Sequence, residues 1–173
     1  MTTDSKSNAK AFVEMIIKRI GGDKAFGAAM RRADNPVTER HSWDYLAQWC
    51  DLEKIDKSRA YALIGAAVAK AKPVQNGSLG IGRAIAQCYA DEGRSNGNEK
   101  DAAKIKLRRL LACKTTKEAC GILRPLLSLI KSRNIHLDYA KLLQELQYND
   151  EAFNDWIKRR WAMDFYNKKE TEE

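Results

Sequence analysis

The sequence predicts an all-α protein. Only three of its 173 residues are proline, and Ala, Leu, Lys and Glu dominate the long segments. Strands with alternating polar and apolar residues are absent, whereas apolar residues recur at the three- and four-residue spacing of amphipathic helices. Hydrophobic residues make up 44% of the chain, which is too many for a disordered protein. We expect two small helical bundles, of which the C-terminal one is an antiparallel four-helix bundle.

Four helices are expected in the first 72 residues. Gly21 ends the first helix because glycine accepts the left-handed geometry of a C-terminal cap, and Asp23 can cap the second. Pro73 ends the fourth helix, whose small apolar residues at 60–69 are typical of a helix inside a bundle. The expected helices cover residues 9–20, 24–33, 38–52 and 57–72.

A fifth helix is expected over residues 79–92, and the most loop-like internal segment follows it at 93–98. Glycine, serine and asparagine concentrate in this segment, which is typical of a linker. We therefore predict one domain over residues 1–92 and a second over residues 99–173.

Four further helices are expected after this boundary. Asn98 is the predicted cap of the first, and Thr115 with Glu118 matches a capping box at the start of the second. Pro125 lies inside that second helix and predicts a kink, because proline removes one backbone hydrogen bond. Asn149 is the predicted cap of the last helix. The expected helices cover residues 99–112, 115–133, 138–147 and 150–167.

The excess positive charge gathers between Lys100 and Arg133. This segment holds ten basic and two acidic residues, a net charge of +8, and the whole chain also carries +8. Basic charge on one structural element is typical of a nucleic-acid-binding protein. An acidic protein, an anionic membrane or plain solvent exposure explains the same charge, so these alternatives stay open.

The sequence favours no catalytic, cofactor or metal site. The four cysteines form no Cys-x-x-Cys pair and the two histidines are not spaced as ligands to them, so buried thiols are the prediction and a zinc site is the alternative. The Gly80–Gly82 segment lacks the preceding strand of a dinucleotide-binding loop. No run is long and apolar enough to span a membrane and no secretory signal is present, which predicts a cytoplasmic protein.

The tryptophans have the spacing of core residues. We expect them to lie on the inner faces of their helices, although stacking of an exposed aromatic ring on a nucleobase stays open. These residues are Trp43, Trp49, Trp156 and Trp161.

Four segments, in order and at matching spacing over residues 78–166, carry a resemblance to a known family. Residues 81–86 have the sequence Ile-Gly-Arg-Ala-Ile-Ala, and residues 106–111 have Lys-Leu-Arg-Arg-Leu-Leu. Residues 122–127 form a Leu-Arg-rich stretch. The last segment combines an Asp-Tyr helix at 137–143 with Arg-Arg-Trp-Ala-Met-Asp-Phe-Tyr at 159–166. Together they resemble the CasB family, the small subunit of the type I-E CRISPR surveillance complex Cascade.

The resemblance implies an all-helical protein without catalytic activity. In that family two copies lie between the backbone subunits and the large subunit of an RNA-guided complex. There they help to hold the hybrid of guide RNA (crRNA) and target DNA, together with the displaced DNA strand. The implied partners are therefore other Cascade subunits, a second copy of the chain, crRNA and target DNA. The rival hypotheses are a free-standing nucleic-acid-binding protein and a structural adaptor whose basic face meets an acidic protein.

We expect the phosphate contacts to come from basic residues that match the motifs or lie on the outer side of the basic helix. Contacts of this kind are independent of sequence and sensitive to salt. An alternative for Arg108 and Arg160 is a position beside the core, with the side-chain stem packed on apolar neighbours. The first group is Arg83, Lys106, Arg109, Arg124, Arg159 and Arg160, and the second group is Lys100, Lys104, Arg108 and Lys131.

Overall fold

The computed structural model describes residues 2–91, 97–147 and 155–167. In these ranges the chain forms nine α-helices and one 3₁₀-helix. The extended backbone is limited there to one isolated parallel bridge between Leu79 and Leu137. The predicted all-α class is confirmed.

The N-terminal elements follow the expected order with two differences. The side chain of Asp23 accepts a hydrogen bond from the Phe26 amide at 2.9 Å, as its predicted role as a helix cap requires. The first helix, however, begins well before residue 9, and the expected helix over 38–52 is replaced by two short elements followed by turns. The elements are α1 (Thr2–Arg19), α2 (Lys24–Arg31), η1 (Glu39–Ser42), α3 (Trp43–Leu46) and α4 (Ile55–Ala71).

The C-terminal elements confirm the capping box at the start of α7. The Thr115 hydroxyl accepts from the Glu118 amide at 3.2 Å, and the Glu118 carboxylate accepts from the Lys114 amide at 2.7 Å. The helix then continues through Pro125 as one element. The elements are α5 (Ile81–Cys88), α6 (Asp101–Leu111), α7 (Thr116–Ser132), α8 (Tyr139–Gln147) and α9 (Asp155–Tyr166).

Two predicted helix caps are not found in the structure. One differs from the cap that the structure shows, and the other lies outside the described residues. Asn98 is not the cap of α6, because the helix begins at Asp101 with Lys100 in the cap position and Asn98 is buried before it. The fifth helix is shorter than predicted. Asn149 and most of the loop at 93–98 lie outside the described residues.

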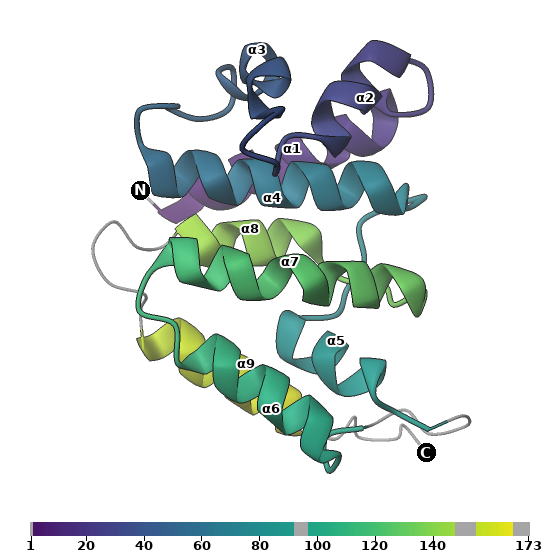
Figure 1. Ribbon diagram of the computed structural model, residues 1–173, viewed down its shortest axis with the longest axis vertical. Coiled ribbons are helices and arrows are strands. Elements are labelled where there is room, and N and C mark those ends of the chain that lie inside the picture. The colour runs from purple at the N-terminus through teal and green to yellow at the C-terminus, as the bar shows by residue number, and fades with distance from the viewer. Residues whose placement is uncertain (1, 92–96, 148–154, 168–173) are drawn as a thin grey trace.

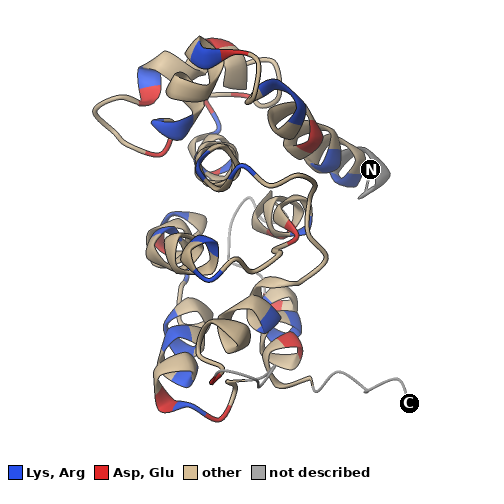
Figure 2. Cartoon of the chain, turned by 90° about the vertical axis from the view of Figure 1, so that its right-hand side faces the viewer, with Lys and Arg blue, Asp and Glu red and all other residues tan. Residues whose placement is uncertain are grey.

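The helices stack in three layers (Figure 1). The top layer pairs α1 with α4 and is capped by α2 and α3, the middle layer pairs α7 with α8, and the bottom layer holds α5, α6 and α9. Seen from the side, α4, α7 and α6 lie toward one side of the molecule and α1, α8 and α9 toward the other (Figure 2). Buried residues from all three layers form one hydrophobic cluster.

Helices on both sides of the predicted domain boundary pack together. α5 precedes the boundary but packs on α9, α6 and α7, whereas α8 follows it and packs on α1 and α4. The bundle around α6, α7 and α9 therefore has α5 as its fourth member, in the place that the sequence analysis gives to α8. The division of the chain into domains at residues 93–98 stays a prediction.

A close approach between backbones joins α5 to α9. A Cβ atom on Gly82 would overlap the carbonyl oxygen of Trp161 and lie 2.7 Å from the amide nitrogen of Phe165. At the start of α5, the Asp164 carboxylate accepts a hydrogen bond from the Arg83 amide at 2.8 Å. Because only glycine lets the two backbones approach this closely, Gly82 serves helix packing.

A buried polar link joins α9 to α8. The indole nitrogen of Trp161 donates to the Glu145 carboxylate at 2.7 Å, and the Trp161 ring is 2% exposed. Burial raises the pKa of Glu145 above its ordinary value of 4.5, while the Trp161 hydrogen bond and the nearby charges of Lys141 and Arg160 act in the opposite direction.

Replacing Gly82 with alanine is expected to destabilise the fold by about 1–3 kcal/mol, because the new methyl group overlaps the backbone of α9. Gly121 on α7 is the matched control, since a Cβ there meets no atom within 4 Å. Gly121→Ala is expected to be neutral or to stabilise the helix by up to about 1 kcal/mol. Denaturant unfolding followed by circular dichroism measures both. Equal stability of the two variants would contradict the proposed contact.

The raised pKa of Glu145 predicts a pH dependence of stability. The unfolded chain loses the Glu145 proton first as pH rises through about 4.5, so the unfolding free energy falls until the pH passes the folded pKa. Glu145→Gln keeps an acceptor for Trp161 but removes this titration. We expect the stability of the variant relative to the unchanged chain to rise with pH above about 4.5, as measured by denaturant unfolding across a pH series. Parallel stability curves would contradict the assignment.

Candidate nucleic-acid interface

The outer face of α6 is basic. Leu107 and Leu110 face the core, and Ile105, Arg108 and Arg109 share the exposed arc on the opposite side. Lys104 and Lys106 lie half-buried at the two edges of this arc. Figure 2 shows the resulting blue segments on the helix at the lower left. Lys100, which precedes the helix, pairs with Asp91 at 3.0 Å and is therefore partly neutralised.

A second exposed stripe runs along α7. Its five residues recur every three or four positions, so they lie on one face of the helix, and all of them are exposed. Three carry positive charge and two are small, which leaves the cations separated by open backbone. The stripe consists of Lys117, Gly121, Arg124, Ser128 and Lys131.

A groove separates this stripe from α4. On the α4 side it is bordered by Arg59 and Lys70, which are eleven residues apart and lie on one face of the helix, with small alanines between them. The groove contains a hollow of about 450 Å³ near Arg59 and a smaller one of about 30 Å³ near Lys70. Asp34 and Arg124 line both hollows, so the two are adjacent. We call this feature, with α4 and α7 as its walls, the α4–α7 groove.

An ion pair divides the groove. The guanidinium of Arg124 donates through Nη2 to Asp34 at 2.9 Å and through Nε to the other carboxylate oxygen. This bidentate contact raises the pKa of Arg124. The Asp34 side chain is 12% exposed and that of Arg124 is 52% exposed, so the acid is covered while the cation still reaches solvent. Arg124 is therefore fixed in position at the middle of the groove.

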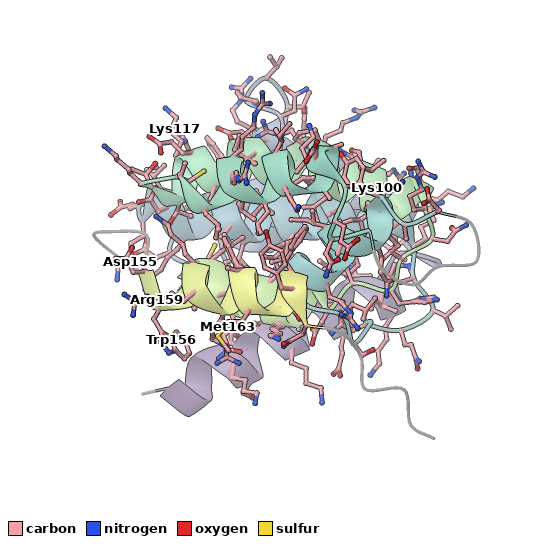
Figure 3. The ribbon with its side chains drawn as sticks, turned by 90° about the horizontal axis from the view of Figure 1, so that it is seen from below. Lys100, Lys117, Asp155, Trp156, Arg159 and Met163 are labelled. Atoms are coloured by element: carbon pink, nitrogen blue, oxygen red, sulfur yellow. The ribbon has the colours of Figure 1, made fainter. Side chains whose placement is uncertain are left out.

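The predicted cations of α9 lie on another side of the molecule. Figure 3 shows Trp156 and Met163 projecting from α9 on the side away from Lys117. Arg159 and Arg160 are exposed, and the Arg160 guanidinium lies 4.8 Å from the centre of the Trp156 ring. Trp156 is 49% exposed, so the prediction that it belongs to the core is wrong.

The structure therefore distributes the predicted basic residues over three places. Lys104, Lys106, Arg108 and Arg109 lie on α6, Arg124 and Lys131 border the α4–α7 groove, and Arg159 and Arg160 lie on α9.

Arg83 departs from the expectation. It is 6% exposed, and its Nη1 atom has no hydrogen-bond partner among the described residues. Because a buried guanidinium presents no surface to a phosphate chain, this burial disagrees with the predicted phosphate contact.

The sequence analysis did not select Arg59, Lys70 and Lys117 as site residues. The sequence marks Arg59 and Lys70 only weakly as site residues, because an arginine and a lysine at the edges of an alanine-rich helix are ordinary in a soluble protein. The eleven-residue spacing of Arg59 and Lys70 predicts that they share a face. It does not predict that this face opposes the basic stripe of α7.

The thiols do not suggest chemistry. Burial raises the pKa of Cys50 and Cys88 to about 11 and that of Cys120 to about 12, and it also raises the pKa of Cys113. All four cysteines are free and stay protonated at neutral pH, which makes them poor nucleophiles. Among the described residues, no group of three or more His, Cys, Asp and Glu side chains could hold a metal ion. No described helix is long and apolar enough to cross a membrane.

Comparison with known families identifies the group to which the chain belongs. The family model of the CRISPR-associated protein Cse2 matches residues 27–166. The chain belongs to the Cse2 family. This confirms the resemblance to the CasB small subunit and extends it into the N-terminal half, beyond residues 78–166 that carry the motifs.

Solved structures share the fold of this Cse2-family chain. A chain of a CRISPR RNA-guided surveillance complex aligns with a TM-score of 0.72 and 20% identity, over 93% of this chain and 92% of that chain. CasB from Thermus thermophilus aligns with a TM-score of 0.65 and 20% identity, over 91% and 97%. A second structure from Thermus thermophilus, of a CRISPR-associated protein of the Cse2 family, gives 0.65 and 19%, over 91% and 97%. No curated protein matches the sequence.

The Arg124–Asp34 pair is expected to contribute a coupling energy of about 0.5–1 kcal/mol to stability, because its geometry is bidentate and Asp34 is largely covered. A double-mutant cycle with Arg124→Ala and Asp34→Ala measures this energy by denaturant unfolding. Lys10 and Glu14 provide the control cycle, since they are 3.8 Å apart and both well exposed. A coupling no larger than that of the control pair would contradict a positioning role for Asp34.

Proposed function

We propose that the chain is a non-catalytic small subunit of a type I-E RNA-guided surveillance complex and that its basic surfaces hold nucleic-acid backbones. The observation that carries the proposal is the arrangement of cations on one side of the molecule. There α6 and the α4–α7 groove carry nine Lys and Arg residues, while the two carboxylates that line the groove are Asp34, covered by Arg124, and Glu39. Family membership supports the assembly.

The chemistry of target recognition explains why such a surface is useful. Opening a DNA target replaces one duplex by an RNA–DNA hybrid of similar stability, so contacts between protein and backbone decide the balance. Fixed cations that neutralise phosphates of the displaced strand or the hybrid favour the open state and oppose re-annealing. The phosphate contacts carry no sequence information, which suits a complex whose guide RNA selects the target.

The proposed partners follow from the same family. They are the backbone subunits and the large subunit of the complex, a second copy of the chain, the crRNA and the two strands of the opened target. The exposed apolar side chains of Trp156 and Met163 on α9 support protein contacts on the side away from Lys117 (Figure 3), and Tyr166 on the same helix is also exposed. Assembly and nucleic-acid binding would then use different sides of one rigid scaffold.

Reversing the charge at the centre of the basic helix tests the proposal. Lys106→Glu with Arg109→Glu is expected to weaken target opening by the assembled complex at least tenfold. It is also expected to reduce the magnitude of the slope of log K against log salt concentration by about 0.7 for each lost phosphate contact to a single strand. Electrophoretic mobility assays across a salt series, with the chain assembled into its complex, measure both effects.

The matched control reverses two exposed lysines on α1 and α2, Lys18→Glu and Lys24→Glu, which changes the net charge equally on another face. Unchanged target binding by the α6 variant would remove these residues from the mechanism. Loss of assembly without loss of nucleic-acid contact would favour the adaptor hypothesis, and tight binding by the isolated chain would favour the free-standing one.

A further inference from the structure

The larger hollow of the α4–α7 groove has an aromatic residue in its wall, and binding of a phosphate would not need one. Its volume is about 450 Å³, within the range of small-molecule sites. Three sides come from segments far apart in the sequence: the turn after α2 with α3, the first half of α4, and the first half of α7. The aromatic side chain on this wall is Trp43, which is 43% exposed.

Trp43 lies on an anchored backbone, and its ring is open to solvent. Leu46, in the same short helix, is 2% exposed and anchors α3 to the core. The neighbouring Tyr45 ring packs edge-to-face on Phe26, with 5.0 Å between ring centres. Both neighbours pack against the core, so the backbone that carries Trp43 is anchored beside the hollow that its side chain lines. The prediction that Trp43 is a core residue is wrong.

The remaining lining combines a small apolar floor with basic edges. Cys120 is 3% exposed and lies at the base, while the exposed Gly121 leaves its part of the hollow open because a Cβ there meets no atom within 4 Å. Arg59, Lys117 and Arg124 border the hollow. Two acids also line it, Asp34, which Arg124 neutralises, and Glu39. An aromatic wall, an apolar floor and surrounding cations are the parts of a site for a nucleotide of a single strand.

We propose that this hollow binds one unstacked nucleobase of a single-stranded nucleic acid, with the base on the Trp43 ring and the flanking phosphates at Arg59 and Lys117. The inference rests on the proposed function and deepens it, because it assigns the strand a path along the α4–α7 groove. The five cations that border the groove favour this occupant over an apolar peptide, and the aromatic wall favours it over an acidic peptide. Every base has a π-face, so the site does not select sequence.

Two probes of equal charge separate base stacking from phosphate attraction. One is an oligothymidylate of about 12 nucleotides, and the other is the same chain with abasic residues throughout. Titrated into the full-length chain at low ionic strength and followed by fluorescence anisotropy, the oligothymidylate is expected to bind about tenfold more tightly than the abasic strand. Trp43→Ala is expected to abolish most of this ratio, and Trp43→Phe to retain most of it.

A second variant guards against a folding defect in Trp43→Ala. Gly121→Leu adds a large side chain at the lining of the hollow, at a position where a Cβ meets no atom within 4 Å, and it is expected to lower the ratio to a similar extent. Ala11→Leu adds the same bulk to an exposed position of α1 and is expected to leave the ratio unchanged. Circular dichroism confirms the fold of each variant.

Two results would overturn the inference. One is a ratio that Trp43→Ala and Gly121→Leu both leave intact, which would place the base contact elsewhere on the molecule. The other is the absence of any difference between the two strands. Neither result depends on the charge-reversal test at Lys106 and Arg109. The abasic and thymidylate strands carry the same phosphates, so the base site can fail while the electrostatic function stands.

Discussion

The packing of α5 against α9 is the constraint on which the rest of the structure depends. Gly82 brings the two backbones together, and Asp164 accepts a hydrogen bond from the first turn of α5. This contact fastens the end of the described chain to a helix that precedes α6 in the sequence. With α5 and α9 behind it, α6 buries only its leucine stripe and turns its basic arc outward. Thus an uncharged close contact determines where the charge is presented.

The same contact explains why two of the family motifs contain residues that serve packing and do not display cations. The Gly-Arg segment and the Trp-Ala-Met-Asp-Phe segment, far apart in the chain, meet at Gly82, Trp161 and Asp164. The spacing of these segments therefore serves packing, and Arg83 is buried with them. Residues such as Arg59 and Lys117 need only a long side chain at an exposed position, so no strict motif has to mark them. The motifs consequently mark both the α5–α9 packing contact and the basic face of α6, but not the cations that α4 adds to the groove.

Sequence reasoning succeeded where a feature depends on neighbours along the chain. The caps at Asp23 and Thr115 follow from local hydrogen bonding, and the all-α class follows from the three- and four-residue spacing of apolar residues. It failed where a distant element decides the outcome. Periodicity places Trp43 and Trp156 on an apolar face but cannot show whether another helix covers that face. Periodicity also cannot predict the groove, because Asp34 and Arg124, which line it, are 90 residues apart in the sequence.

The net charge of a segment is likewise a poor measure of the field that a ligand meets. The segment from Lys100 to Arg133 accounts for the whole excess charge, yet Lys100 is paired with Asp91 and Arg124 with Asp34. The exposed cations of α6 are joined by Arg59 and Lys70 from a helix outside that segment. Asp34 reduces the local charge but holds the planar guanidinium of Arg124 at one place, where a flexible lysine would lose more entropy on binding. A groove that guides a strand benefits from such fixed cations, because their side chains lose little conformational entropy when the strand binds.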